Sequence, residues 1–233
     1  MFIFECGLTA GNGLCHDVNV HSHKGCMKVK KQPTEIRQNE IAQAALDLIG
    51  SRGMKGLRMA AIAKKVGIVP SGIYRHFQSK DEVIDAILDF IQHRFIANAR
   101  SAARMKGDAL TRLHALLMKH VSLVRENASI PVVIFSADVY TTSPRRRVKL
   151  FGIIESYLAE IAVIIEQGQR EGTIRRDVEP SSVAVMFMGL IQPPTILWHL
   201  SAGTYDVIQQ AEAAWPIFCR AVEHQKNEIQ EPQ

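Results

Sequence analysis

A run of hydrogen-bonding side chains follows Pro70. The segment PSGIYRHF, residues 70–77, carries hydroxyl, phenol, guanidinium and imidazole groups beside one glycine. Groups of this kind hydrogen-bond to phosphate oxygens and to the edges of bases. Ile73 and Phe77 stand four apart, so in a helix both can face inward while the polar side chains face outward. The segment therefore has the side chains of a helix that binds nucleic acid.

The elements that would position these side chains are two short helices joined by a glycine turn. Apolar residues between Met59 and Val66 fall at i, i+3, i+4 and i+7, which is one face of a helix. Gly67 suits a helix C-terminus, where a positive φ is common. Pro70 suits the first turn of the next helix, where an N–H would be unpaired in any case. Two helices in this arrangement are typical of a helix-turn-helix DNA reader.

The pattern IA…G…Y.HF.SK, from Ile62 to Lys80, resembles the DNA-binding domain of the tetracycline-repressor (TetR) family of bacterial transcription regulators. With the helices before and after it, the resemblance covers residues 34–95. It implies an all-α fold, in which an N-terminal three-helix DNA-binding domain is joined to a helical domain that binds an effector and forms a homodimer.

The resemblance also implies which residues contact DNA. Residues 70–72 stand where the family touches base edges or the adjacent backbone, and Tyr74, His76 and Lys80 stand where it usually holds phosphates. The candidate DNA-binding residues are Arg58, Pro70, Ser71, Gly72, Tyr74, Arg75, His76 and Lys80.

Two positions depart from the family pattern. Many members carry a base-reading arginine where this chain has Ala60, and Arg58 lies near enough to substitute for it. Val69 replaces the usual capping serine, so we expect the recognition helix to lack a side-chain N-cap.

Flanking helices are predicted on both sides of the motif. Residues 34–51 repeat apolar side chains at helical spacing before Gly53. Ser79 and Glu82 form an S-x-x-E capping box, in which each side chain pairs with the N–H of the other. Lys80 then falls in the first turn of a long helix, where free N–H groups and the helix dipole favour a phosphate.

The basic residues concentrate in the same part of the chain. Residues 27–100 hold 13 Lys and Arg against 7 Asp and Glu, whereas residues 101–233 hold 14 of each. A phosphate-binding surface requires such an excess. Lysines on a helix are also common on a solvated face, and Lys64 and Lys65 remain open to that interpretation.

The first 33 residues differ from the rest, because they show no helical or strand period. A disordered leader is one interpretation, and a natural start at Met27, followed by a short basic arm, is a sharper one. A zinc site is the alternative, although its spacing fits no familiar pattern. Its ligands would be Cys6, Cys15, His16, His21, His23 and Cys26.

Beyond residue 100 the pattern is helical throughout. We expect helices near 109–126, near 145–171 with an end at Gly172, from Pro180 onward, and over 206–224, with a weaker apolar stretch at 130–140. The expected domains are 34–95 for DNA binding and 96–226 for effector binding and dimerisation, followed by a tail at 227–233.

In the resembling family the last two helices form the four-helix bundle of the dimer, so residues 180–224 are assigned to dimerisation. Pro193, Pro194 and Pro216 fall inside these helices and must kink or break them. Apolar residues of the last helix recur at a 3-4-3-4 spacing, which is a packing seam. The candidate interface residues are Ile208, Ala211, Trp215, Phe218 and Val222.

Large side chains of the second half could line an effector cavity, although residues at helical spacing are more often core. The candidates are Met118, Phe135, Tyr140, Tyr157, Met186, Met188 and Trp198. The basic cluster at 145–149 is open to three interpretations, a solvated face, an anionic ligand site or a second DNA contact.

Several classes of protein are excluded or disfavoured. No G-x-S-x-G, Walker loop, G-x-G-x-x-G or H-E-x-x-H motif is present, so we expect no enzyme, cofactor or metal. Four cysteines in these positions are no disulfide framework. No apolar run approaches the about 20 residues that span a membrane, and a basic segment followed by a long apolar one is absent from the N-terminus. We expect a cytoplasmic protein.

The sequence thus predicts a homodimeric regulator that binds a palindromic DNA operator and is released by a small apolar effector. One alternative is a nucleoid-associated DNA-binding protein without an effector, which a filled core would favour. Another is an all-helical enzyme or interaction module, which convergent polar groups in a deep pocket would favour.

Overall fold

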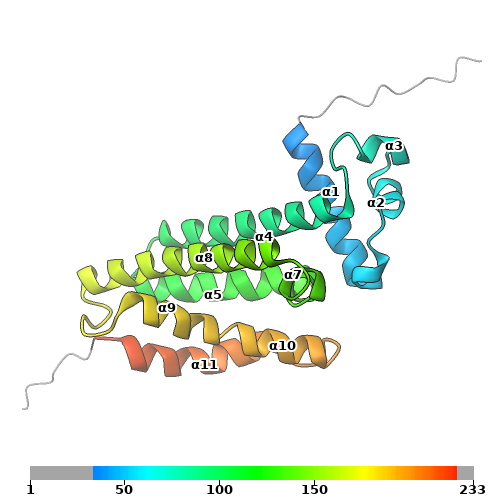
Figure 1. Cartoon of the computed structure of the whole chain (residues 1–233). Coiled ribbons are helices and arrows are strands. Elements are labelled where there is room, and N and C mark those ends of the chain that lie inside the picture. Colours follow the sequence, from blue (N-terminus) through cyan, green and yellow to red (C-terminus); the bar gives the residue numbers. More distant parts are fainter. Residues whose placement is uncertain (1–33, 225–233) are drawn as a thin grey trace, which may run out of the picture. The chain divides into compact units, whose positions relative to one another are not determined.

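The computed structural model describes residues 34–224, and the regular elements of this part are helices (Figure 1). The expected all-α fold is confirmed. The interpretations made for residues 1–33 and 225–233 lie outside the described residues. An isolated antiparallel bridge joins Ile174 to Glu223, next to the end of the last helix.

The N-terminal elements surround a small apolar core. Ile41 and Ile49, Ile62, Ile73 and Ile87 are buried there. In chain order the elements are α1 (Thr34–Arg52), a 3-10 turn η1 (Met54–Gly56), α2 (Met59–Val66), α3 (Pro70–Ile73) and α4 (Lys80–Ala103).

The second part is a larger helical bundle that α4 enters. α5 packs against both α4 and α8, α9 packs against α8, and α11 packs against α5 (Figure 1). The elements are α5 (Ala109–Glu126), α6 (Ser129–Ile134), α7 (Ala137–Tyr140), α8 (Pro144–Glu171), α9 (Pro180–Gly189), α10 (Gln192–Leu200) and α11 (Val207–Val222). The expected helices near 109–126 and 145–171 are confirmed, and the weak apolar stretch forms α6 and α7.

Helix ends follow the local chemistry of the sequence. Gly67 and Gly172 end α2 and α8 with φ of 77° each, the left-handed conformation that glycine adopts without strain. Ser79 Oγ accepts from the Glu82 N–H at 3.2 Å and caps α4. The second half of the predicted capping box is wrong by one residue, because the Glu82 carboxylate accepts from the Gln78 N–H at 2.7 Å instead of that of Ser79.

The prolines of the C-terminal helices act in two ways. The helix predicted from Pro180 breaks at Leu190–Ile191, and Pro193 then lies in the first turn of α10. α11, in contrast, continues through Pro216. Because proline has no N–H, the carbonyl four residues earlier, that of Glu212, loses its helical partner without ending the helix.

Within residues 34–224, one segment is long and apolar enough to cross a membrane, by length and composition alone. It is Pro180–Leu200, with a mean hydropathy of 1.4, and 39% of it is buried. The expectation that no apolar run approaches this length is therefore wrong. The segment comprises α9 and α10, which pack on α8 and α11, and many of its apolar side chains remain exposed.

Candidate nucleic-acid interface and ligand cavity

The helix-turn-helix presents its polar residues as expected. Ser71, Tyr74 and Arg75 are exposed, whereas Ile73 and Phe77 are buried. The candidate residues Arg58 and Pro70 are exposed on the same segment, and Gly72 is half-buried. Hydrogen-bond donors thus line the outer side of the turn between α2 and α4, where a duplex can approach.

The recognition helix is shorter than the predicted one. α3 ends at Ile73, and the backbone N–H groups of Arg75 and His76 bond three residues back, to Gly72 and Ile73, in a tighter turn. Val69 offers no side-chain cap, as expected. A glycine inside a helix is less favourable than alanine by about 1 kcal/mol, so Gly72 and the missing N-cap both weaken this short helix.

Two of the expected phosphate contacts already have other surroundings. The Nδ1 atom of His76 is buried and has no hydrogen-bond partner among the described residues. Lys80 Nζ donates to the Met54 carbonyl at 3.4 Å and lies 3.8 Å from Asp138 Oδ2 of α7. Lys80 therefore joins the DNA-reading segment to the second part of the chain.

Basic residues within 145–149, at the N-terminus of α8, form ion pairs with aspartates of α4. Arg146, nearly buried, lies 2.8 Å from the Asp81 carboxylate and 3.0 Å from that of Asp85. Arg145 pairs with Asp85 at 3.4 Å and Lys149 with Asp89 at 2.7 Å. Aspartates one turn apart on α4 engage these three side chains, and Arg146 among them is buried, whereas Arg145 and Arg147 are exposed.

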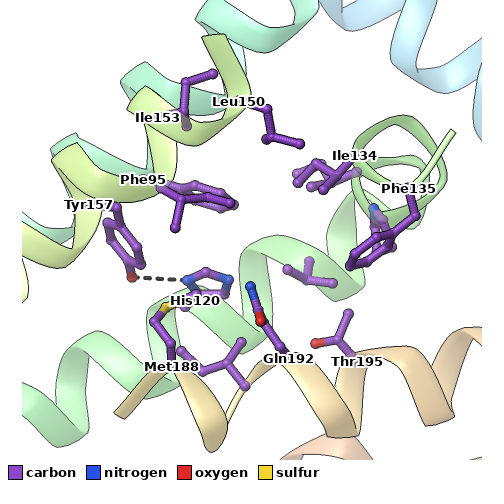
Figure 2. Close-up of a pocket in the computed structure, with 15 residues that line it drawn as sticks. Phe95, His120, Ile134, Phe135, Leu150, Ile153, Tyr157, Met188, Gln192 and Thr195 are labelled. Carbon is purple, nitrogen blue, oxygen red and sulfur yellow. Dashed lines mark hydrogen bonds between the residues drawn. The ribbon is translucent and has the colours of Figure 1, made fainter. Parts of the chain in front are cut away.

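A cavity of about 70 Å³ lies within the helical bundle (Figure 2). Side chains from α4, α5, α8 and the segment α9–α10 form its walls, and α6 closes one end. Apolar groups dominate the lining. The residues are Phe95, His120, Val124, Ile130, Pro131, Ile134, Phe135, Leu150, Ile153, Ile154, Tyr157, Met188, Ile191, Gln192 and Thr195.

The polar groups of the cavity sit among aromatic rings. His120 Nδ1 and the Tyr157 hydroxyl are hydrogen-bonded at 2.9 Å, as the dashed line in Figure 2 marks. The Phe95 ring stacks on His120, with centroids 4.6 Å apart. Burial lowers the pKa of His120 to about 4 and raises that of Tyr157. Both side chains are therefore uncharged near neutral pH.

Three of the seven predicted effector residues, Phe135, Tyr157 and Met188, line this cavity, and four do not. Tyr140 and Met186 are exposed, since their positions on α7 and α9 face away from the cavity. Met118 lies in a shallow hollow on the outer side of α5, and Trp198 packs on the core from α10.

Sequence reasoning missed His120, Gln192 and Thr195 as cavity residues. A signal for His120 was present, because it stands three and four residues from Leu117 and Leu116 on the apolar side of α5. An imidazole at such a position is buried and needs a partner. Gln192 and Thr195 carried no signal, since the break before α10 sets which side they face.

The predicted seam of α11 faces its own subunit. Ala211, Phe218 and Val222 are buried within the single chain. The half-buried Trp215 stacks on Phe218, with centroids 5.3 Å apart, and lies 5.1 Å from the His114 ring of α5. Ile208 packs at the edge of the same core. The exposed apolar side chains of α9–α11 are instead Val185, Met186, Ile196, Leu197, Leu200 and Ile217.

Two family models match the chain across this arrangement. Residues 41–87 match the one described as "Bacterial regulatory proteins, tetR family", and residues 91–221 match the one described as "YsiA-like protein, C-terminal region". The second match alone covers more than half of the chain. This chain belongs to the TetR family. The resemblance carried by Ile62 to Lys80 is thereby confirmed.

Relatives of this TetR-family chain include a fatty acid metabolism regulator and a nucleoid occlusion factor. The fatty acid metabolism regulator protein of Bacillus subtilis (strain 168) is 22% identical over 169 residues, covering 72% of this chain and 87% of the relative. The nucleoid occlusion factor SlmA of Sodalis glossinidius (strain morsitans) is 23% identical over 196 residues, covering 82% and 97%.

Solved structures agree on the fold. The transcriptional regulator FadR from Bacillus subtilis, in complex with stearoyl-CoA, superposes with a TM-score of 0.67 at 20% identity, over 77% of this chain and 96% of that one. FadR from Bacillus halodurans gives a TM-score of 0.68 at 18% identity, over 78% and 97%. At such identities the likeness shows the fold alone.

Proposed function

We propose that this TetR-family chain is a homodimeric transcriptional repressor that a small, mainly apolar ligand releases from a palindromic operator in the cytoplasm. The observation that carries the proposal is the pairing of an exposed helix-turn-helix with a small, mainly apolar cavity, joined by helices that touch both. Membership of a family of regulators and the similarity to FadR, solved with stearoyl-CoA, support it.

The contacts between cavity and reader supply the coupling. α6 supplies cavity walls through Ile130, Pro131 and Ile134, and it packs directly against α1. Beside it, Asn127 Oδ1 accepts from Gln43 Nε2 of α1 at 3.2 Å. The next helix, α7, holds Asp138 near Lys80. A ligand that displaces α6 therefore moves groups in contact with the first and last helices of the reader.

The cavity must open to receive such a ligand. Its volume of about 70 Å³ is smaller than the about 150 Å³ of an engineered cavity that binds benzene. Phe135 lines the cavity while half of its surface is exposed, so it stands where the cavity meets solvent. Ligand binding then selects an open arrangement of α6 and α7, and DNA selects the closed one.

Dimerisation follows from the exposed apolar face of α9–α11. Leu197, Leu200 and Ile217 are each about half or more exposed in the single chain. Large apolar patches of this kind mark interaction sites, and two readers are needed because successive half-sites lie about one helical turn apart. The interface assigned here uses these exposed residues in place of the buried seam.

A DNA-binding protein without an effector is the second candidate. The small volume of the cavity and the similarity to nucleoid occlusion factor SlmA favour it. In that case the cavity is a packing defect, and DNA affinity does not respond to small molecules.

Two measurements separate the candidates. Sequencing of genomic DNA captured by the purified chain defines an operator, and fluorescence anisotropy on that operator then follows release by a panel of lipophilic compounds. Release by a compound that also raises the melting temperature of the free protein supports the repressor. Binding to many sites without a shared palindrome, unaffected by every compound, contradicts it.

A further inference from the structure

Thr195 has a hydroxyl that the folded chain leaves without a partner. Its Oγ1 atom is buried, and no described residue pairs with it. The residue is 7% exposed and lines the cavity from α10 (Figure 2). A helical threonine often bonds to the carbonyl four residues earlier, yet the Ile191 carbonyl accepts the Thr195 backbone N–H at 3.0 Å and not the hydroxyl. An unpaired buried hydroxyl destabilises the folded chain, because it has lost its hydrogen bonds to water.

Two further polar side chains border the same space. Gln192 lies three residues before Thr195, so the two share one face of α10. His120 reaches the cavity from α5, and its Nδ1 atom is engaged by Tyr157. Figure 2 shows the imidazole of His120 and the carboxamide of Gln192 at the same end of the cavity. Polar groups thus interrupt an otherwise apolar wall, and the exposed Gln192 lies where the cavity meets solvent.

The lining carries no counterion for a charged ligand. None of its fifteen residues is Asp, Glu, Lys or Arg. His120 is held neutral, because burial lowers its pKa to about 4. A carboxylate or an ammonium group that entered would lose its hydration, at several kcal/mol, without an opposite charge to compensate.

We propose that this cavity selects an uncharged apolar molecule with one hydrogen-bonding oxygen, a hydroxyl or a carbonyl, which pairs with Thr195 Oγ1 beside Gln192 and His120. This inference rests on the proposed function, since it names the ligand class of the effector cavity. The apolar wall accommodates the body of the molecule, and the oxygen satisfies the hydroxyl that the protein leaves unpaired.

The test uses the full chain and four probes with the same carbon skeleton, which are octane, octanol, octanoate and octylamine. Dissociation constants come from calorimetric titration near neutral pH. We expect octanol to bind at least about tenfold more tightly than octanoate and octylamine, a ratio that corresponds to about 1.4 kcal/mol. Equal or tighter binding of either charged probe, or no binding of octanol, overturns the proposal.

Variants identify the hydroxyl. Thr195→Val keeps the shape of the side chain and removes its oxygen, so octanol affinity should fall several-fold to tenfold while octane affinity stays the same. The same change should raise the melting temperature of the free protein, because an unpaired polar atom is removed. Thr204→Val, which alters an exposed hydroxyl after α10, is the matched control.

An octanol affinity unchanged by Thr195→Val overturns the proposal, whatever the effect of Gln192→Leu. Operator binding, measured separately by anisotropy, distinguishes the two levels of inference. If the chain binds its operator and a charged compound releases it, the proposed function is supported and the proposed ligand class is wrong. If the chain prefers octanol but binds no operator, the ligand class is supported and the proposed function is wrong.

Discussion

At the scale of single residues, the reader has two kinds of polar side chain. Tyr74 projects freely from the turn after α3, with about half of its surface exposed. Lys80 is tied to the Met54 carbonyl and lies near Asp138. The Tyr74 hydroxyl can therefore contact a phosphate without breaking another contact. Lys80 must either break its contacts with Met54 and Asp138 or contact DNA while keeping them.

The first prediction concerns these two residues. Tyr74→Phe and Lys80→Ala should each weaken binding to operator and random DNA about equally, because phosphate contacts carry no base information. Lys80→Ala should lower the slope of log K against log salt by roughly one, and Tyr74→Phe should leave it unchanged. Anisotropy across a salt series measures both, and an unchanged slope for Lys80→Ala removes that residue from the interface.

The second prediction follows from the buried imidazole. The pKa of His120 is about 4 in the folded chain against an ordinary 6.5, because burial disfavours its charged form. Between these values the unfolded chain binds a proton that the folded chain does not. The free energy of unfolding therefore falls as the pH drops through this window, by up to roughly 3 kcal/mol, and the contribution is level above it.

His120→Gln has no titrating group at this position. Urea unfolding of both proteins, from about pH 7 to about pH 4, should show the stability advantage of the wild type over the variant shrinking as the pH falls. Two curves that stay parallel across this range would mean that the pKa of His120 is the same in the folded and unfolded chains.

At the scale of helices, α4 and α8 are held together by charge as well as by apolar packing. The guanidinium of Arg146 is nearly buried between Asp81 and Asp85, and it also donates to the Asp138 carbonyl at 3.3 Å. Asp81 and Asp85 lie in the first two turns of α4, directly after the helix-turn-helix. The ion pairs of Arg146 therefore fix how α4 packs against α8 at this end of the bundle.

The third prediction compares the two aspartates. Asp85→Asn should destabilise the fold by about 2–4 kcal/mol, because it leaves the buried Arg146 charge poorly compensated. Asp81→Asn is the matched control: that carboxylate is mostly exposed, and its loss should cost less than about 1 kcal/mol. Thermal unfolding measures both, and equal losses would show that burial does not distinguish the two pairs.

The fold was more predictable than the site. Apolar periodicity and cap residues such as Gly67 and Gly172 are local signals, and they placed most helices within a residue or two. The cavity depends on which faces of six elements converge, and no local pattern carries that information. The seam of α11 shows the limit: its period was correct, but a period does not say whether the stripe packs on its own chain or on another.

At the scale of the whole molecule, the proposed mechanism depends on the assembly of two chains. Ile217 lies on the exposed side of α11, next to Trp215, which packs inward. A substitution of Ile217 should therefore affect the association of two chains, whereas a substitution of Trp215, two positions earlier, should affect the fold.

The fourth prediction uses this contrast. Ile217→Glu should give a folded monomer whose operator affinity falls by at least about tenfold, because a single reader buries too little surface for tight specific binding. Val148→Glu, an equally exposed change at the start of α8, is the control and should remain like the wild type. Trp215→Asp should instead unfold the chain. Light scattering and circular dichroism separate these outcomes, and a dimeric Ile217→Glu would place the interface elsewhere.

The small volume of the cavity has a consequence for how the proposed ligand response would be tuned. If the binding-competent state is rare, the measured dissociation constant equals the intrinsic one divided by the fraction of open molecules. Contacts that hold α6 and α7 shut, such as Asn127 with Gln43 and Asp138 with Lys80, then set the effector concentration at which genes respond. Natural variants could shift that threshold over orders of magnitude while every residue that touches the ligand stayed the same.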